Sequence, residues 1–436
     1  MKARVYWLGL ALLCSACAAP SLRYKTDVNR LAYQGDFKSA AQLVADKRHK
    51  TYARHDRALA YLDEAALRHD AQDPLASDKL LAQAQERIEE LYTVSASKSA
   101  ARLLVNDLTL PYDVAPYERA FTYFYRAANF LDQNNLSEAA VEARRAAAYL
   151  DGLRGSKKKG YNDDPFVQYF ASLIFESVGQ RSDARICREN SLDAYARLGG
   201  LLRVSSPDFP VPSQDGEWGE VIVLHYNGLM PLKKTQTIQF SWSRILGILS
   251  SDQENRYGVS PEVNNALRAG FMGHAVTVAY PVLEIQPFTI VSSAVQANGQ
   301  LYKLHKMADL AAAAQADLEE KLPGVWFRAA LRAVAKQVAA EQARQAARHA
   351  AKDDLTGDLT GLFVNILGAA TEKADTRQWF TLPAQIYMAR LFLPPGVQNI
   401  RLLFRNGYGN IIGEHIFENV HVRKGGRVFL HYRTAK

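Results

Sequence analysis

Residues 170–184 read FASLIFESVGQRSDA, and this stretch decides the fold of the N-terminal half. Aromatic and aliphatic residues precede Gly179 at helical spacing, and the small residue Ala184 follows where a second helix would lie. Glycine readily adopts the left-handed conformation that often ends a helix. The stretch therefore predicts two helices joined by a tight turn at Gly179.

The same layout of helix, turn and helix returns three times in the N-terminal half. The copies lie around Gly35 in LAYQGDFKSAA (31–41), around Asp70–Pro74 within residues 59–91, and around Asn134 or Asn135 in YRAANFLDQNNLSEAA (125–140). The first two turns are about 35 residues apart, close to the 34-residue period of a tetratricopeptide unit. Asparagine also tolerates the left-handed conformation, so it can replace glycine at the third turn.

One helix pair cannot bury its apolar face alone, so several pairs must stack. We therefore predict a tetratricopeptide-like α-solenoid over residues 26–202. The concave face of such an array can capture an extended peptide or a partner helix. Many arrays instead brace another domain, and the repeats do not decide between these two roles.

The composition changes after Leu202. Residues 203–218 contain three prolines among polar turn residues and read as a linker. Strand patterns follow at 220–226, 274–282, 290–304 (split by Asn298-Gly299), 385–393, 399–405, 411–422 and 427–432. The predicted fold class is α+β, with a mainly β sandwich or barrel-like domain over residues 219–436.

A helical insertion interrupts the β-rich part at about residues 306–370. Pro323-Gly324 is expected to divide it into two helices, because proline breaks the hydrogen-bond ladder of a helix. Arg328, Arg332 and Lys336 recur at four-residue spacing and give the second helix a basic face. That face could contact an anionic lipid or cell-wall surface, or it could simply be a solvated face.

The first sixteen residues have the parts of a secretory signal. Lys2 and Arg4 form a positive start, and residues 5–13 form an apolar run too short to cross a hydrocarbon core of ~30 Å. Ser15 and Ala16 then precede Cys17. We predict lipoprotein processing, with residues 1–16 removed, palmitate and other acyl chains on Cys17, and residues 17–25 as a tether.

Two other readings of the N-terminus stay open. They are ordinary cleavage near Ala18–Ala19 and an uncleaved N-terminal anchor. Cys14 occupies the position where leucine usually stands in the lipoprotein motif, and lipidation at Cys14 itself would place the bulky Leu13 at the cut.

The residue after Cys17 and the net charge indicate where the protein is located and which partners are expected. Ala18 is not the aspartate that commonly retains lipoproteins at the inner membrane, so the expected location is the periplasmic face of a bacterial outer membrane. The formal charge of +8 falls by two when Lys2 and Arg4 are removed, which is mildly basic for a large chain. An exported protein of this charge is not expected to bind nucleic acid.

Signatures of catalysis are missing from the sequence. It contains no G-x-S-x-G, H-E-x-x-H, P-loop or strand-linked G-x-G-x-x-G motif, and the C-x-x-C spacing of Cys14 and Cys17 lies at the predicted lipoprotein cleavage site, so we expect neither an enzyme nor a cofactor. His415, His421 and His431 could meet on neighbouring strands, but without a nearby cysteine or carboxylate pair they do not predict a metal site. Cys187 is expected to be a buried apolar residue.

Four acidic residues stand in pairs at predicted turns. These are Asp70 with Asp73, and Asp163 with Asp164. Pro165 follows the second pair, and proline is favoured in the first turn of a helix, so helix capping is expected rather than acid–base catalysis.

Several stretches resemble a family of bacterial outer-membrane lipoproteins with tetratricopeptide-like repeats. They are PYER (116–119), EAAVEARRA (138–146), NGLMPLK (227–233), ADL (308–310), LEEKLPG (318–324) and TEKADTRQWFTLP (371–383). Together they cover most of the mature chain. The family pattern usually has alanine where this chain has Met230.

The resemblance implies a role in envelope assembly without an assigned reaction. Members are encoded near small lipoproteins that look like activators of peptidoglycan synthases, so a synthase or its activator is the implied partner. The hypothesis is a lipid-anchored periplasmic scaffold or adaptor. Alternatives are a structural accessory of an export or surface-polymer machine and a peptidoglycan-binding protein. The WFTLP stretch (379–383) is expected to pack the helical insertion onto the sheet.

Overall fold

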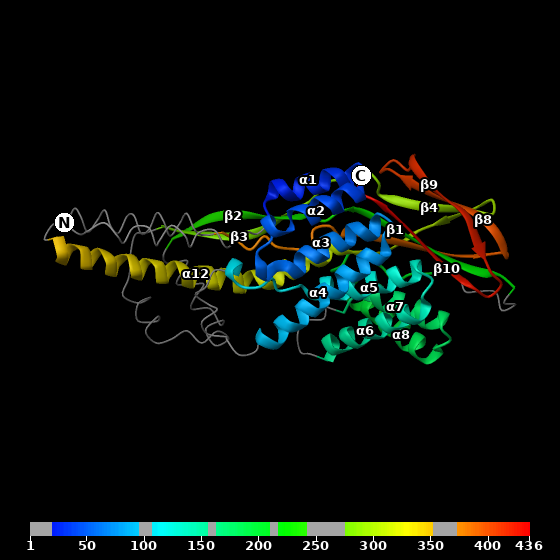
Figure 1. Ribbon diagram of the computed structural model, residues 1–436, viewed down its shortest axis with the longest axis horizontal. Coiled ribbons are helices and arrows are strands. Elements are labelled where there is room, and N and C mark those ends of the chain that lie inside the picture. The colour runs from blue at the N-terminus through cyan, green and yellow to red at the C-terminus, as the bar shows by residue number, and fades with distance from the viewer. Residues whose placement is uncertain (1–19, 96–106, 156–162, 210–216, 242–274, 352–372) are drawn as a thin grey trace.

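The computed structural model describes residues 20–95, 107–155, 163–209, 217–241, 275–351 and 373–436, and its fold is α+β (Figure 1). The predicted signal sequence and Cys17 lie outside the described residues. The N-terminal helices are α1 (Leu22–Tyr33), α2 (Phe37–Thr51), η1 (Arg54–Asp56), α3 (Arg57–Asp70), α4 (Pro74–Ser95), η3 (Asp107–Thr109), α5 (Pro116–Asp132), α6 (Leu136–Gly155), α7 (Pro165–Ser177) and α8 (Arg181–Leu198).

The four predicted turns are confirmed, one between each pair of helices. Their residues with positive φ are Gly35 (81°), Gln72 (61°), Asn134 (55°) and Gly179 (76°). At each turn the following N–H bonds to the carbonyl five residues back, as from Gln180 to Phe175 at 2.9 Å. Because each turn repeats the same local geometry, the pattern of helix, turn and helix could be predicted from the sequence. Gln72 is the exception, because glutamine rarely adopts this conformation.

The first helix of each pair is the more buried one. Every residue of α7 from Pro165 to Phe175 is buried, whereas α8 buries only six of its residues. A helix that is apolar on all sides must be covered on all sides. Helices α1, α3, α5 and α7 therefore form an inner row, which faces the strands.

The strands form three sheets that are mostly antiparallel. The strands are β1 (Gly219–Leu229), β2 (Leu232–Ser241), β3 (Ala275–Glu284), β4 (Ser292–Ala297), β5 (Gln300–Lys303), β6 (His305–Asp309), β7 (Pro383–Leu393), β8 (Gly396–Arg405), β9 (Ile411–Val422) and β10 (Arg427–Thr434). Sheet A has the order β10-β1-β7-β6, sheet B pairs β2 with β3, and sheet C has the order β5-β4-β8-β9. Strand β10 pairs parallel with β1.

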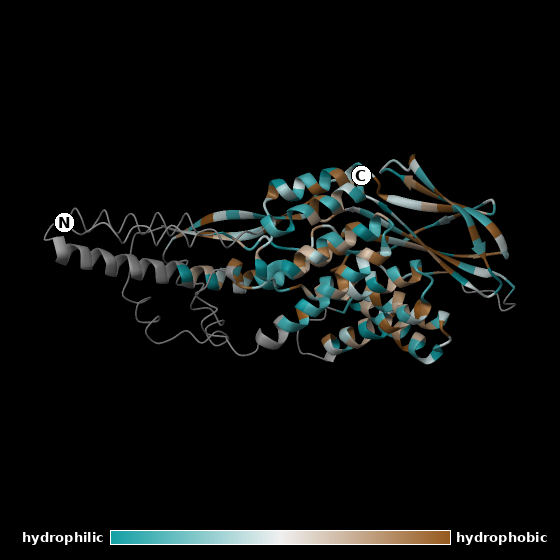
Figure 2. Cartoon of the chain, viewed as in Figure 1, coloured by the Kyte–Doolittle hydropathy of each residue, from teal (hydrophilic) through white to brown (hydrophobic). Residues whose placement is uncertain are grey.

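Sheet A lies between the helices and sheet C. Alternate residues of β1 show this, because Ile222 and Leu224 belong to the core shared with the helices, while Val221 and Val223 belong to the core shared with sheet C. Figure 2 shows brown, apolar residues alternating with teal, hydrophilic ones along the strands, while the outer helix α4 is largely teal. One apolar core thus runs from the N-terminal helices into the β-rich half.

The helical insertion differs from its prediction. A single helix, α12 (Leu310–Ala351), runs through Pro323 without dividing. Pro323 is exposed, and so is Glu319 four residues earlier, whose carbonyl loses its helical partner. Water can solvate that carbonyl, which makes proline tolerable there. The expectation of two helices was therefore wrong.

Helix α12 and sheet B extend together from one end of the molecule (Figure 1). Trp326 of α12 packs between two rings of sheet B, with its centroid 5.1 Å from Phe240 and 4.9 Å from Tyr280. No helix within the described ranges is long and apolar enough to cross a membrane.

Candidate functional site: the segment around Arg377

Residues 375–382 form a segment without regular secondary structure that ends in a turn at residues 380–382 and contacts both the inner helices and the sheets. Trp379 and Phe380 are fully buried, and the Trp379 ring lies 5.8 Å from the ring of Tyr125 in α5. Residues 379–383 were expected to pack the helical insertion onto the sheet. Their ring contacts and hydrogen bonds instead join the N-terminal helices to the β-rich half.

Three inner helices hold the main chain of this segment through buried charged side chains. The bonds run from Lys25 Nζ to the carbonyl of Thr376 (2.6 Å), from the N–H of Trp379 to Glu118 (2.9 Å) and from the N–H of Phe380 to Asp63 (3.1 Å). Lys25 lies on α1, Asp63 on α3 and Glu118 on α5. This is how a helical array would hold an extended peptide, but the peptide here belongs to the same chain.

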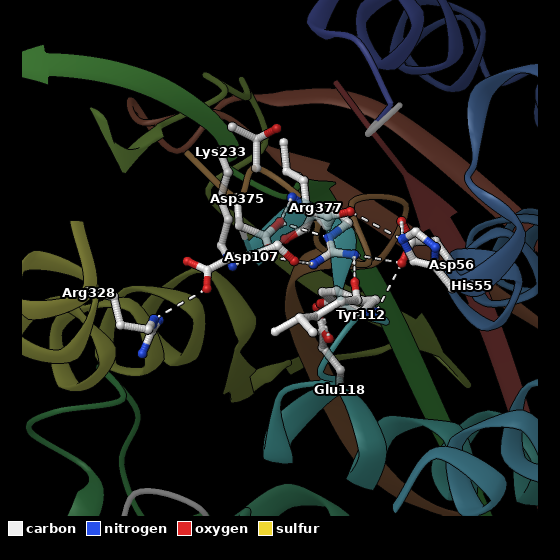
Figure 3. A network of polar contacts seen from close by, with 12 residues as sticks. His55, Asp56, Asp107, Tyr112, Glu118, Lys233, Arg328, Asp375 and Arg377 are labelled. Carbon is white, nitrogen blue, oxygen red and sulfur yellow. Dashed lines mark hydrogen bonds and ion pairs between the residues drawn. The ribbon is translucent and has the colours of Figure 1, made fainter. Parts of the chain in front are cut away.

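Arg377 is the most heavily bonded side chain of the segment (Figure 3). Its guanidinium donates to Asp56 at 2.7 Å and to both carboxylate oxygens of Asp375 at 2.7 and 2.9 Å. It also donates to the carbonyls of Asp107 (2.8 Å) and Leu110 (2.7 Å). A planar fork of five N–H donors is suited to such a set, and a lysine could not reproduce it.

Burial and charge shape the protonation of this site. Burial lowers the pKa of Lys25 to about 8 and raises the pKa of Asp63 to about 8. Burial also raises the pKa of Glu118. For Asp375 burial acts in the same direction, but the hydrogen bond and charge of Arg377 outweigh it and lower the pKa.

These shifted groups have structural partners rather than room for a substrate. Lys25 is 1% exposed and Asp63 is fully buried, and both bond to the main chain of the segment. Perturbed pKa values often mark catalytic sites, but ion pairs that support the fold produce them too. The geometry fits the second case.

The basic face predicted on the helical insertion meets an acid of the helical half. Arg328 lies 3.3 Å and Arg332 3.9 Å from Asp107, and Arg332 is only 8% exposed. The side chain of Lys336 lies outside the described part. Contact of this face with an anionic surface stays a prediction, with two of its three cations already beside a carboxylate.

The three strand histidines do not come together. His415 stacks on Tyr432, with ring centroids 3.8 Å apart, and His421 is exposed. His431 instead lies beside His69 of α3 and Asp132 of α5, where a group of possible metal-ligand atoms lies within 4.8 Å. Sequence spacing could not show this cluster, because its members are far apart along the chain.

A hydrogen-bond chain in this cluster argues against a metal. The Ser77 hydroxyl donates to the Ala65 carbonyl, and Asn129 Nδ2 donates to Ser77, which leaves Asn129 Oδ1 to accept from His69 Nδ1 at 2.7 Å. That assignment, inferred from the network, places the proton on His69 Nδ1. This nitrogen lies 3.8 Å from Asp132, so in this tautomer His69 Nδ1 has no lone pair to offer a metal beside Asp132.

In each acidic pair, one aspartate caps a helix. Asp164 accepts from the N–H of Val167 at 2.9 Å, and Asp73 accepts from Ala76 at 3.3 Å. Their neighbours form ion pairs instead, Asp163 with Arg154 and Arg197, and Asp70 with Arg433. Capping was therefore right for Asp73 and Asp164 and wrong for Asp70 and Asp163.

Cys187 is buried in α8, and burial raises the pKa of its thiol to about 11. A thiol in that state is a poor nucleophile. This agrees with the expected role as a small apolar residue.

Comparison with protein-family models, with curated proteins and with solved structures finds no match. The resemblance drawn from the sequence stretches stays a prediction. The residues that hold the 375–382 segment carried one signal in the sequence, since Asp63 and Glu118 are acids set within otherwise apolar helix faces.

Proposed function

We propose that this protein is a lipid-anchored periplasmic scaffold that binds protein partners in envelope assembly. In this proposal the tetratricopeptide-like repeats form a short solenoid that braces a sandwich built from sheets A and C. The observation that carries it is the occupation of the inner helix row by the chain's own segment, 375–382.

That observation bears on the two roles open to a repeat array. A peptide-capturing array keeps main-chain binding groups available for its partner. Here Lys25, Asp63 and Glu118 already bind the main chain of the protein itself, and the side chain of Trp379 is fully buried. Bracing is therefore favoured, and partners would bind elsewhere on the molecule.

The anchoring part of the proposal rests on the N-terminal sequence. An apolar run of signal-peptide length, the small residues Ser15 and Ala16, and then Cys17 support acylation at Cys17. Each buried CH₂ contributes about 0.8 kcal/mol, so several acyl chains on one cysteine suffice for stable anchoring. Outer-membrane localisation is part of the same proposal.

Two alternatives remain candidates. A structural accessory of an export or surface-polymer machine would use the same braced architecture. Direct peptidoglycan binding through the basic face of α12 has less support, because Arg328 and Arg332 lie against Asp107. A peptidoglycan synthase or its activator remains the first partner to test.

The first experiment tests the anchor. We expect Cys17→Ser to abolish labelling by radioactive palmitate and to release the protein from the outer-membrane fraction. Cys187→Ser is the matched control, and it should leave both unchanged. Labelling that survives Cys17→Ser would contradict acylation at this cysteine and direct attention to Cys14.

The second experiment tests the scaffold. Gentle cross-linking in whole envelopes followed by affinity purification should recover an envelope protein reproducibly, with penicillin-binding proteins and their activators examined first. Failure to recover any stoichiometric partner would contradict the proposed adaptor role. Release of muropeptides by the purified protein would overturn the non-enzymatic proposal.

A further inference from the structure

A cleft of about 900 Å³ opens at the edge of sheet A, away from the 375–382 segment. One wall is the turn between α5 and α6, where Leu131 and Leu136 are half-buried. The other wall is the start of β10, from Arg427 to Phe429. Clefts that bind ligands commonly measure about 300–1,000 Å³.

The wall formed by β10 is the free edge of a sheet. The N–H of Glu220 bonds to the carbonyl of Gly426, and Glu220 is paired with Arg427 in a parallel register. In this register Gly426 and Val428 point their main-chain groups toward β1. Arg427 and Phe429 point theirs outward, and no described strand pairs with β10 on that side.

One cation in the lining of the cleft is left to pair with an anionic group of an occupant. Glu176 is bound by Arg188 and Arg427, and Glu220 is bound by Arg390 and Arg427. Arg188 and Arg390 do not line the cleft, and within its lining Arg427 pairs with both carboxylates. Arg423 is that cation: it lines the cleft, is exposed, and has no carboxylate partner among the described residues.

The cleft also has apolar surface to bury. Trp218 is 49% exposed at its rim, and Phe392, Phe429 and the two leucines of the α5–α6 turn line it. An unpaired edge with apolar walls is a template for strand addition.

We propose that the free edge of β10 receives an extended, acidic segment of a partner protein as an added strand. The main chain of that segment would bond to the outward groups of Arg427 and Phe429. One carboxylate would lie at Arg423, and alternate apolar side chains would contact Leu131 and Leu136. This inference rests on the proposed scaffold function and names the partner surface within it.

The test uses the purified full chain and a displayed library of random six-residue peptides. We expect enrichment of peptides with an acidic residue followed by alternating apolar residues. Arg423→Glu should weaken the binding of a selected peptide about tenfold, since it replaces attraction by repulsion. Lys303→Glu, an exposed cation on β5, is the matched control and should change binding little.

Backbone recognition is tested on the peptide itself. In an added strand, alternate N–H groups face β10 and the intervening ones face away. N-methylation at the facing positions should abolish binding, while N-methylation at the intervening positions should leave it within about threefold. Equal effects at all positions would overturn strand addition.

Other outcomes are equally decisive. No enrichment, or binding insensitive to Arg423→Glu, would overturn the proposal, even if an envelope partner is recovered by cross-linking. A dimer broken by Arg423→Glu would assign the edge to a second copy of the chain. A disulfide forming between Ser213→Cys and Leu136→Cys would assign the cleft to the chain's own segment 210–216.

Discussion

The side chain of Arg377 bonds to residues that are far away in the sequence. Its partners Asp56, Asp107 and Leu110 lie on the other half of the chain, 267 to 321 positions away. A buried ion pair is costly to form, because both charges leave water. Once formed, removal of one member leaves the other charge buried without a partner. The residue therefore determines how the two halves meet rather than how either half folds locally.

We expect Arg377→Ala to lower the free energy of unfolding by about 3–5 kcal/mol, because it removes the arginine that pairs with the buried carboxylate of Asp56. Arg377→Lys keeps the charge and loses part of the donor set, so a smaller loss of about 2 kcal/mol is expected. Urea unfolding measures both. Arg401→Lys, at a surface pair, should cost under about 1 kcal/mol, and an equal loss in all three variants would contradict the argument.

His69 should make stability depend on pH. Burial, followed by the charge of His431, lowers the pKa of His69 to about 4 from its ordinary 6.5. Between pH 4 and pH 6.5, His69 is therefore protonated in the unfolded chain and neutral in the folded chain. Stability from this group is present above pH 6.5 and is lost as the pH falls toward 4.

The expected loss between pH 7 and pH 5 is about 2 kcal/mol, at ~1.4 kcal/mol per pKa unit. Urea unfolding of the protein and of His69→Gln at both pH values tests it, because the variant lacks the titrating group. The difference between them should shrink by about that amount at pH 5. His421→Gln, an exposed histidine, should follow the parent protein at both values.

At the scale of elements, the sequence predicted what local geometry dictates. Helix pairs and their turns at Gly35, Asn134 and Gly179 depend on residues within one turn of each other, and all were found. The hairpin at Asn298-Gly299 was found for the same reason, and it joins β4 to β5. These features need no distant partner.

The elements missed depend on distant partners. Strand β6 has only five residues, and its partner strand β7 follows about eighty positions later in the sequence. Strand β2 is mostly exposed and polar, so its pattern carried little apolar alternation. The continuity of α12 through Pro323 depended on which face was solvated. None of these facts is written in a short window of sequence.

Glycines of the helical half provide a matched pair for testing the turns. Gly179 has a φ of +76°, and Gly152 lies inside α6 with ordinary helical geometry and open space around it. Gly179→Ala should destabilise by about 1 kcal/mol, because alanine is strained in the left-handed region. Gly152→Ala should stabilise by about 0.5–1 kcal/mol. Thermal unfolding distinguishes the signs, and like signs would contradict the turn assignment.

At the scale of the whole molecule, one core joins segments that composition suggested were separate. Tyr226 and Trp379 of the β-rich half belong to the same buried cluster as Phe124 and Phe170 of the helices. The inner helices therefore complete the packing of sheet A. The β-rich half would expose this surface if it were made alone.

We expect the two halves to unfold together. Hydrogen exchange followed at increasing urea should show α5 and β1 losing protection at the same concentration, as a cooperative unit does. A fragment of residues 203–436 should fail to give a cooperative transition. Independent folding of that fragment with native protection would contradict a shared core.

The bond from Lys25 to the carbonyl of Thr376 also has a mechanical consequence. Lys25 lies in the first turns of α1, so tension arriving along the chain from before Pro20 enters the molecule at that helix. The bond passes part of this tension directly to the main chain beside Arg377, without a route through the other helices. Under load, the contacts between the two halves of the molecule would therefore yield first. Pulling on the N-terminus of single molecules should therefore shear this junction before any strand of sheet C unzips.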